Sequence, residues 1–333
     1  MALRVGIDVS ALALTRAGTA RHIRSLLAAL EHEDVDVRRY ALGGSSRGLV
    51  PLRDLGWYLA ALPAKARRDG IEVLHCPTQR APVRSRLPLI VTFHDLAVLR
   101  HPETFNRWTR TYSRAVLPRV VRGASRLIVV SEFTKRELLE LLDAPEEKVR
   151  VVPNAVDPQF SPEGEAAPGE YVLAVSTLEP RKNLPRLLEA YRRSGLNGLP
   201  LLVAGARGWG GVRVDGDGVR LLGEVGDDEL ARLYRGARAV AYVSLYEGFG
   251  LPVLEAMACG APVVAASTGA LEEVAGGAAV LVDPLDPDAI AAGLAEAIDR
   301  REELRPLGLE RARAFDWHEV ARETVAVYRE AAA

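Results

Sequence analysis

Two kinds of apolar pattern alternate along the first half of the chain. Short runs of branched apolar residues predict buried strands, and stretches with an apolar residue every three or four positions predict amphipathic helices. The predicted strands cover residues 5–9, 73–75, 89–93, 127–130 and 149–152, and the predicted helices cover 18–30, 52–69, 105–121 and 132–142. This alternation favours a parallel sheet with helices on both faces.

The pattern breaks at residues 157–169 and then restarts. This segment is rich in proline, glycine and acidic residues and has no apolar period, which predicts an interdomain linker. Beyond it, strands are predicted at 171–175, 199–204, 219–222, 239–243 and 261–265, and helices at 183–193, 227–234 and 317–330. We therefore expect two doubly wound α/β units, each with its ligand crevice at the carboxyl ends of the strands.

The composition is that of a soluble globular protein. A length of 333 residues suits two domains, and 48% of the residues are hydrophobic while 26% are charged. No apolar stretch approaches the roughly 20 residues that span a bilayer, and the strand pattern near Met1 predicts no signal peptide. Cys76 and Cys259 each lie in an apolar run, which is typical of reduced core thiols in a cytoplasmic protein.

The net charge of −1 conceals a difference between the two halves. Residues 1–150 hold 25 Lys and Arg against 16 Asp and Glu, whereas residues 151–333 hold 18 against 28. Arg107, Arg110 and Arg114 share one face of a predicted helix that also carries Trp108 and Tyr112. This face is either an ordinary solvated surface or a dock for an anionic acceptor or an anionic membrane, and it does not lead us to expect a nucleic acid.

The segment 247–255 combines a strand end, a glycine-containing loop and a helix start. It follows the predicted strand 239–243, and Pro252 suits the first helical turn because its missing N–H would be unpaired there. Gly260 is placed to end the helix. Free N–H groups at such a helix start favour an anion, and Glu247 and Glu255 flank that position. The alternative is that both carboxylates merely stabilise a helix end.

A second segment, 176–184, places two cations next to a predicted helix start. Asn183 is expected to cap this helix, so that its positive pole faces Arg181 and Lys182. Each cation there is unfavourable by roughly 0.3–1 kcal/mol unless an anion occupies the space. A diphosphate would supply that anion, and a solvated basic loop is the alternative.

Other candidates for metal or ligand contacts are weaker. Gly18 opens the first long helix, where a glycine lets a ligand approach the backbone, and His94 follows the predicted strand 89–93. Residues 34–36 and 215–217 each read Asp-x-Asp, but both are predicted to lie in polar turns, so we expect no metal site. No Cys/His cluster is present, and no cofactor is predicted.

These segments together resemble the retaining family 4 (group 1) glycosyltransferases, which have the GT-B fold. Residues 247–255 are similar to the family's E-x7-E motif, and the likeness continues through 256–264, 273–274, 152–157, 130–134, 92–95 and 315–317. It covers essentially the whole chain. It implies an α/β GT-B architecture, in which two Rossmann-like domains face each other across a cleft. The expected domains are 1–160 on the acceptor side, 170–314 for the nucleotide sugar, and a helix 315–333 that crosses back.

The resemblance also implies roles for particular residues. Glu247 would orient the donor sugar, Glu255 would hold the ribose, His94 would touch the sugar, and Lys182 would bind the diphosphate. Thr177 stands where many members have arginine, and whether Arg181 takes over that contact stays open. The expected catalytic residues are Glu247, His94, Arg181 and Lys182. The expected donor-binding residues are Gly18, Asn154, Ser176, Glu247, Gly248, Phe249, Gly250, Leu251 and Glu255.

The implied activity is transfer of a hexose from a nucleotide sugar to a hydroxyl of a glycan or lipid-linked acceptor, with retention and without a metal. Residues 176–183 and 244–255 are most similar to bacterial mannosyltransferases of polysaccharide biosynthesis, which favours GDP-mannose and leaves UDP-glucose open. We expect a cytoplasmic enzyme that acts at the inner face of the membrane.

Three other activities are compatible with parts of this pattern. A glycoside phosphorylase or sucrose-synthase-like activity, or an inactive nucleotide-sugar-binding module, would use the same scaffold. A nicotinamide dehydrogenase would need G-x-G-x-x-G after the first strand, where residues 17–20 read Ala-Gly-Thr-Ala instead.

Overall fold

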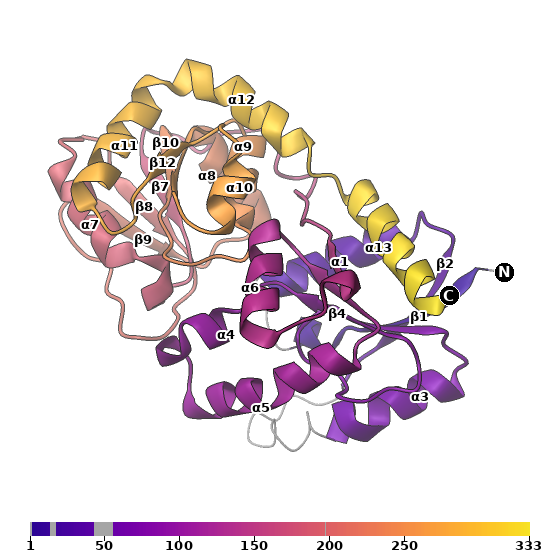
Figure 1. The fold of residues 1–333 in the computed structure, drawn as a ribbon. Coiled ribbons are helices and arrows are strands. Elements are labelled where there is room, and N and C mark those ends of the chain that lie inside the picture. Colours follow the sequence, from indigo (N-terminus) through magenta and orange to yellow (C-terminus); the bar gives the residue numbers. More distant parts are fainter. Residues whose placement is uncertain (1, 14–17, 43–55, 197) are drawn as a thin grey trace. The chain divides into compact units, whose positions relative to one another are not determined.

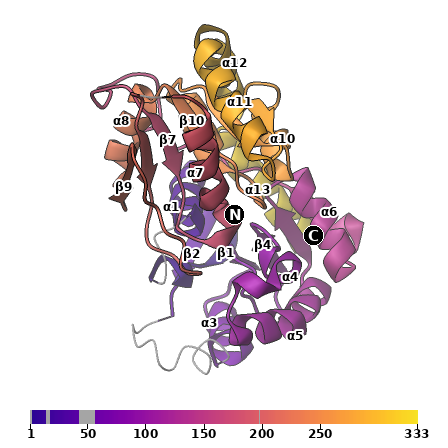
Figure 2. The same cartoon turned by 90° about the vertical axis from the view of Figure 1, so that its left-hand side faces the viewer.

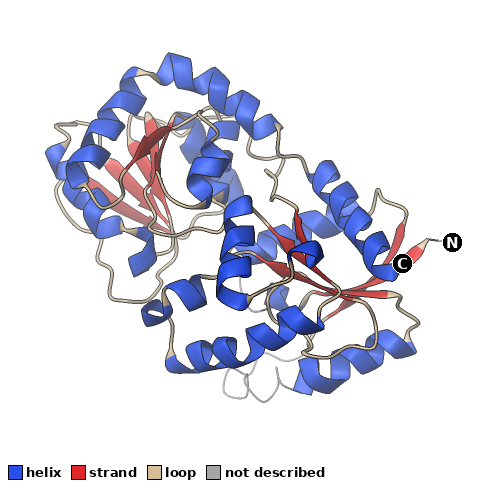
Figure 3. Ribbon diagram, viewed as in Figure 1, coloured by secondary structure: helices blue, strands red, loops and turns tan. Residues whose placement is uncertain are grey.

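The computed structural model describes residues 2–13, 18–42, 56–196 and 198–333, and it divides the chain into two compact units. Unit 1 runs to Asn154 and also includes Asp316–Ala333, and unit 2 is Ala155–Phe315. Each unit is a six-stranded sheet of parallel strands with helices on both faces (Figure 3). The predicted α/β class with two doubly wound units is confirmed.

The sheet of unit 1 has the strand order β2-β1-β3-β4-β5-β6 (Figure 1). Its strands are β1 Leu3–Asp8, β2 Val35–Tyr40, β3 Val73–Cys76, β4 Leu89–Phe93, β5 Arg126–Val129 and β6 Val149–Val151. Its helices are α1 Gly18–Leu30, α3 Leu62–Arg68, α4 Ala97–Arg100, α5 Arg107–Gly123, α6 Glu132–Leu142 and α13 Trp317–Ala332, with short turns η1 Ser10–Ala13, η3 Trp57–Ala61, η4 Pro102–Thr104 and η5 Glu146–Lys148. The strand order reverses between β1 and β3, which is where such sheets bind ligands.

The sheet of unit 2 has the order β12-β11-β10-β7-β8-β9. Its strands are β7 Val172–Val175, β8 Leu201–Ala204, β9 Val219–Gly223, β10 Ala239–Tyr242, β11 Val263–Ala266 and β12 Val280–Val282. Its helices are η6 Pro180–Lys182, α7 Leu184–Arg193, α8 Asp227–Gly236, α9 Leu251–Ala258, α10 Ala270–Ala275, α11 Pro287–Asp299 and α12 Arg301–Arg313. α7 packs on α11, and α11 lies next to α12 (Figure 2). This is the Rossmann order, and it reverses between β7 and β10.

The central strands are buried on both faces, which explains their continuous apolar runs. Every residue of β3, β4, β10 and β11 is buried. A parallel sheet covered by helices on both sides leaves no polar face on such strands. Cys76 and Cys259 are buried and unpaired by any disulfide, as predicted for core thiols.

The turn predicted at residues 34–36 is wrong, because this stretch enters strand β2. β2 pairs in parallel with β1 and is the edge strand of its sheet, with alternating half-buried and exposed residues. An edge strand exposes part of its surface to water, so charged residues such as Asp36 and Arg38 are tolerated and obscure the apolar signal. Residues 52–55 of the predicted helix 52–69 lie outside the described residues, and the rest forms η3 and α3.

The predicted linker 157–169 is not a free linker, because unit 2 holds it. The ring of Phe160 packs on Tyr234, with 5.9 Å between centroids. The Arg235 guanidinium donates hydrogen bonds to the carbonyls of Gln159, Ser161 and Glu165. The chain therefore passes between the units at residues 154–155 and again at 315–316.

The C-terminal helix α13 belongs to unit 1 and packs on α1, β3 and β4. The Tyr328 hydroxyl lies 2.8 Å from His75 Nδ1, and the other ring nitrogen of His75 lies 2.8 Å from the Thr92 hydroxyl. Glu330 near the helix end pairs with Arg126 and Arg150. A buried polar chain and a surface ion-pair cluster thus fasten the last helix to the sheet.

The free energy of unfolding of unit 1 should decrease as the pH is lowered, because His75 is buried in the neutral form. Burial, aided by the nearby His94, lowers the pKa of His75 from 6.5 to about 3. Between these values the unfolded chain binds a proton at this residue and the folded chain does not. The free energy of unfolding should therefore fall by about 1.4 kcal/mol per pH unit from this group as the pH drops below 6.5.

Urea unfolding of the wild type and of His75→Gln between pH 7 and 4 would measure this contribution. The variant should be less stable at pH 7 and should lose stability less steeply on acidification. His318→Gln, which changes an exposed histidine, should keep the wild-type slope. Equal slopes for all three proteins would contradict the prediction.

Candidate active site

The strand order of unit 2 brings two loops together at the carboxyl edge of its sheet. β7 and β10 are parallel neighbours, with Val172 opposite Ala239. The loop after β7 carries Lys182, and the loop after β10 carries Glu247. Because the strand order reverses between these two strands, the loops form the place where a doubly wound sheet binds its ligand.

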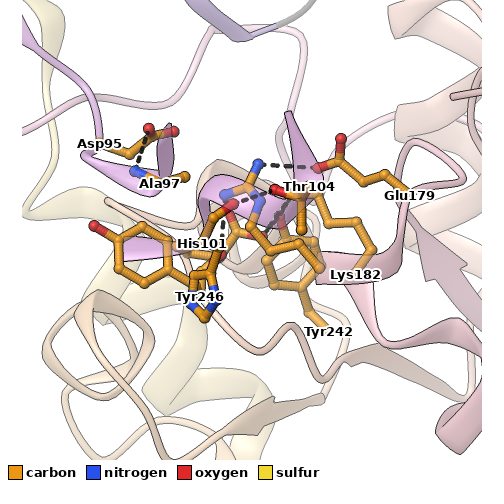
Figure 4. Close-up of polar contacts among 10 residues, drawn as sticks. Asp95, Ala97, His101, Thr104, Glu179, Lys182, Tyr242 and Tyr246 are labelled. Atoms are coloured by element: carbon orange, nitrogen blue, oxygen red, sulfur yellow. Dashed lines mark hydrogen bonds and ion pairs between the residues drawn. The ribbon is translucent and has the colours of Figure 1, made fainter. Parts of the chain in front are cut away.

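Lys182, Glu247 and Tyr242 form a closed triangle of contacts in this place. The Lys182 ammonium lies 2.6 Å from Glu247 Oε1 and 3.0 Å from the Tyr242 hydroxyl, and the hydroxyl lies 2.9 Å from the same carboxylate oxygen. The ammonium also lies over the Tyr242 ring, 5.3 Å from its centroid. Lys182 and Tyr242 are both labelled in Figure 4. Only 12% of the Lys182 side chain and 10% of that of Glu247 are exposed.

The two charges keep each other ionised. Burial alone would raise the pKa of Glu247, but the charges of Lys182 and Arg181 and hydrogen bonds from Lys182 and Ser244 hold it below its ordinary value. Burial would likewise lower the pKa of Lys182, yet the charge of Glu247 raises it. A buried ammonium and a buried carboxylate are therefore both charged at neutral pH.

Arg181 is engaged by protein groups. Its guanidinium donates to Glu179 Oε1 and to the carbonyl of Tyr246, each at 3.0 Å, and lies 3.6 Å from Glu247 Oε2. The loop after β10 is further tied to it by a hydrogen bond from the Leu245 N–H to the Arg181 carbonyl. Glu179 and Tyr246 are drawn in Figure 4. Arg181 thus joins the two loops.

The helix after Glu247 begins as the sequence predicts. α9 starts at Leu251 with Pro252 in its first turn, and Gly260 follows its end with a φ of 76°. Gly250 precedes the helix with a φ of 112°, and a Cβ there would lie 2.5 Å from Leu271 Cδ2. Gly248 and Phe249 complete this turn, and the Phe249 ring packs on Phe315. Only glycine fits position 250.

Glu255 of α9 is buried, and Ser176 is a half-buried residue that follows β7. Glu255 is 2% exposed and accepts a hydrogen bond from the Tyr234 hydroxyl at 3.1 Å. Ser176 follows β7, and its buried hydroxyl has no hydrogen-bond partner among the described residues.

The capping role predicted for Asn183 is wrong. Asn183 precedes α7 with a φ of 59°, and its side chain makes no capping hydrogen bond. Its amide instead donates to the carbonyls of Val243 and Pro284. The side chain therefore links the loops after β7, β10 and β12, which local sequence could not indicate.

The other predicted site residues, Gly18, His94 and Asn154, belong to unit 1. Gly18 is the first residue of α1. His94 follows β4, with its Nε2 3.0 Å from the Pro77 carbonyl, and burial lowers its pKa. Its ring lies 4.7 Å from that of His22, whose Nδ1 is 2.8 Å from Asn154 Oδ1. The structure thus brings His94 and Asn154 together through His22.

The neighbour of His94 has a local task. Asp95 accepts a hydrogen bond from the Ala97 N–H at 3.0 Å and so stabilises the start of α4 (Figure 4).

Within the described ranges, no three His, Cys, Asp or Glu side chains gather as a metal site requires. The same part of the chain contains no helix that is long and apolar enough to cross a membrane.

Two family descriptions match successive halves of the chain. Residues 6–160 match "Glycosyltransferase Family 4" and residues 156–312 match "Glycosyl transferases group 1". The chain belongs to the group 1, family 4 glycosyltransferases. It is 31% identical over 329 residues to the O-antigen chain mannosyltransferase B of Escherichia coli, with 91% of this chain and 82% of that protein covered.

Other relatives are matched over less of their length. The chain is 33% identical to the MMP alpha-(1->4)-mannosyltransferase of Mycolicibacterium hassiacum and 32% identical to the D-inositol 3-phosphate glycosyltransferase of Kineococcus radiotolerans. In both cases 74% of this chain and 66% of the relative are covered.

Solved structures show the fold. Sucrose-phosphate synthase from Thermosynechococcus elongatus superposes with a TM-score of 0.78 at 20% identity and covers 98% of each chain. Anabaena HepE in complex with UDP and glucose gives 0.73 at 18%, over 98% of this chain and 100% of that one. The fold is GT-B.

The sequence did not point to Tyr242, Glu179 or Tyr234, which hold the predicted residues. A signal for Tyr242 existed, because it ends a strand that is otherwise apolar and buried. A buried phenol needs a partner for its hydroxyl, and a strand end next to a predicted site supplies one. Glu179 and Tyr234 carried no such local signal.

Proposed function

We propose that this glycosyltransferase moves a hexose from a nucleotide-sugar donor to a hydroxyl of a glycan or lipid-linked acceptor, with retention and without a metal ion. The observation that carries the proposal is the buried pair of Lys182 and Glu247 where the strand order of unit 2 reverses. Donor binding is assigned to residues 170–314 and acceptor binding to residues 1–160.

Lys182 is suited to meet a diphosphate. Its ammonium has three N–H groups, and Glu247 and Tyr242 accept two of them. The third has no acceptor within the described ranges, so it can donate to a phosphate oxygen. Negative charge grows on the diphosphate as the sugar leaves, and a preorganised cation lowers the barrier for that step. The N–H groups at the start of α9, over Gly248–Leu251, would add to it.

Glu247 is suited to hold the reacting sugar. It is ionised and can only accept hydrogen bonds, so the remaining lone pairs of its carboxylate can accept hydrogen bonds from sugar hydroxyls. We assign His94 to the donor sugar and Glu255 to the ribose, and Gly18, Asn154 and Ser176 to further donor contacts. Arg181 lends its charge to the site through Glu247.

The relatives support a choice of donor. Two of them are named as mannosyltransferases, which favours GDP-mannose, and HepE is described in complex with UDP and glucose, which makes UDP-glucose the second candidate. The O-antigen relative supports a role in polysaccharide biosynthesis. We further propose that the enzyme acts on the cytoplasmic side of the membrane.

A donor panel tests this proposal. Among GDP-, UDP- and dTDP-sugars, GDP-mannose should raise the unfolding temperature most, because at equal concentration the ligand with the lowest Kd stabilises the folded protein most. A ligand at a hundred times its Kd stabilises the folded protein by about 2.7 kcal/mol. Transfer should retain the anomeric configuration by NMR and should persist in EDTA. An inverted product, or activity that EDTA abolishes and Mn²⁺ restores, would contradict the proposal. Faster turnover with free phosphate as acceptor would indicate a phosphorylase.

Substitution of Glu247 and of Glu255 should affect different kinetic parameters. Glu247→Gln should mainly lower kcat, because its proposed partner is the reacting sugar, and Glu255→Gln should mainly raise the donor KM. Glu272→Gln, an exposed change in the same unit, is the matched control. If both active-site variants altered only KM, the assignment of Glu247 would fail.

We also propose that α5 docks the protein on an anionic surface. Arg107, Arg110 and Arg114 form no ion pair within the described part of the chain, and Trp108 is 52% exposed. Each basic residue near an anionic membrane contributes about 1 kcal/mol, less as salt rises. An amphipathic aromatic ring such as Trp108 suits the same interface.

Cosedimentation with vesicles tests this surface. Binding should be seen with anionic but not neutral lipid and should weaken with salt. The triple variant Arg107→Gln, Arg110→Gln, Arg114→Gln should lose it. The matched triple Arg213→Gln, Arg313→Gln, Arg322→Gln, which removes the same charge elsewhere, should retain it. Equal binding by both triple variants would rule out α5 as the dock.

A further inference from the structure

The Tyr242 hydroxyl occupies a position that permits only one arrangement of hydrogens. An ammonium can only donate, an ionised carboxylate can only accept, and a hydroxyl has one proton to give. Tyr242 therefore accepts a hydrogen bond from Lys182 and donates its proton to Glu247, at 3.0 and 2.9 Å. The hydroxyl thereby fixes the directions of both partners.

We propose that Tyr242 is a positioning residue of this active site: its hydroxyl sets the orientation of the Lys182 ammonium and holds the Glu247 carboxylate in place. This inference rests on the proposed function of the site. Tyr242 itself contacts neither the donor nor the acceptor in this proposal. It acts through the two charged residues.

The backbone of Tyr242 is suited to such a task. It is the last residue of β10, is 4% exposed, and lies opposite Ala265 of β11, while the residue before it lies opposite Ala174 of β7. Lys182, in contrast, ends the short helical turn η6, and Glu247 stands on the loop after β10. A rigid ring rooted in the sheet can hold these two side chains more tightly than they hold each other.

The ion pair alone would not achieve this. Attraction between an ammonium and a carboxylate depends little on direction, so it does not decide where the remaining N–H of Lys182 points. The Tyr242 ring below the ammonium and the hydroxyl beside it restrict that choice. The N–H left over then has a defined direction in which a phosphate oxygen can be met.

The hydroxyl also affects the charge of Glu247. A hydrogen bond donated to a carboxylate favours its ionised form. The Tyr242 hydroxyl donates such a bond to Glu247 at 2.9 Å. Without it, burial, which acts to raise the pKa of Glu247, would be less well opposed. The acid limb of a pH–rate profile that depends on ionised Glu247 should then move to higher pH.

Tyr242→Phe tests the inference, because it removes the hydroxyl and keeps the ring. Loss of a hydrogen bond to charged groups should lower kcat about ten- to a hundredfold. The donor KM should change far less, and the acid limb of the kcat profile should shift upward. Tyr171→Phe is the matched control, since its buried hydroxyl donates to the Leu233 carbonyl in the same unit, and it should leave kcat and its pH profile unchanged.

The outcomes separate this inference from the proposed function. A Tyr242→Phe enzyme with wild-type kcat and pH profile would overturn the positioning role, even while Glu247→Gln is inactive. Wild-type protein that transfers no sugar from any donor would overturn the proposed function. In that event, NMR titration of labelled glutamate still decides on Tyr242: an unchanged Glu247 pKa in the variant refutes the role, and a raised pKa supports it.

Discussion

The buried contact between Lys182 and Glu247 is the constraint on which the organisation of unit 2 depends. Removing two charges from water costs several kcal/mol each, and only close pairing with further hydrogen bonds offsets that cost. The pair spans loops that are 65 residues apart in sequence, so it forms only if β7 and β10 are neighbours. Chain order alone would not bring these loops together, because α7, β8, β9, α8 and β10 lie between Lys182 and Glu247.

The surrounding residues can be understood as support for this contact. Arg181 brings a second cation towards Glu247 and is itself balanced by Glu179. The Asn183 side-chain amide donates hydrogen bonds to two loop carbonyls and does not cap its own helix. Gly250 lets the chain turn into α9 directly after Glu247. In unit 1, by contrast, the buried ionisable groups are uncharged. Burial lowers the pKa values of His22, His75 and His94 and keeps their rings neutral.

Most elements were predictable because buried parallel strands and amphipathic helices leave strong local patterns. α6 and α1 begin where they were expected, at Glu132 and Gly18. The misses share a cause. β2 is an edge strand whose exposed residues hide its period, and the segment 157–169 looks like a linker until Arg235 and Phe160 are seen to hold it on unit 2. Neither the pairing of β2 with β1 nor the contacts of Arg235 and Phe160 can be recognised from the local sequence.

The sequence by itself determined the two doubly wound units, the family and the two loops on which Lys182 and Glu247 stand, because periodicity and motif spacing are local properties. Only the tertiary structure decided which groups meet there. Tyr242 became part of the site, Arg181 was bound by Glu179 and Tyr246, and Asn183 turned from capping to bridging. The physical reason is that contacts between loops depend on strand order across the sheet, and strand order leaves no mark on any single stretch of the chain.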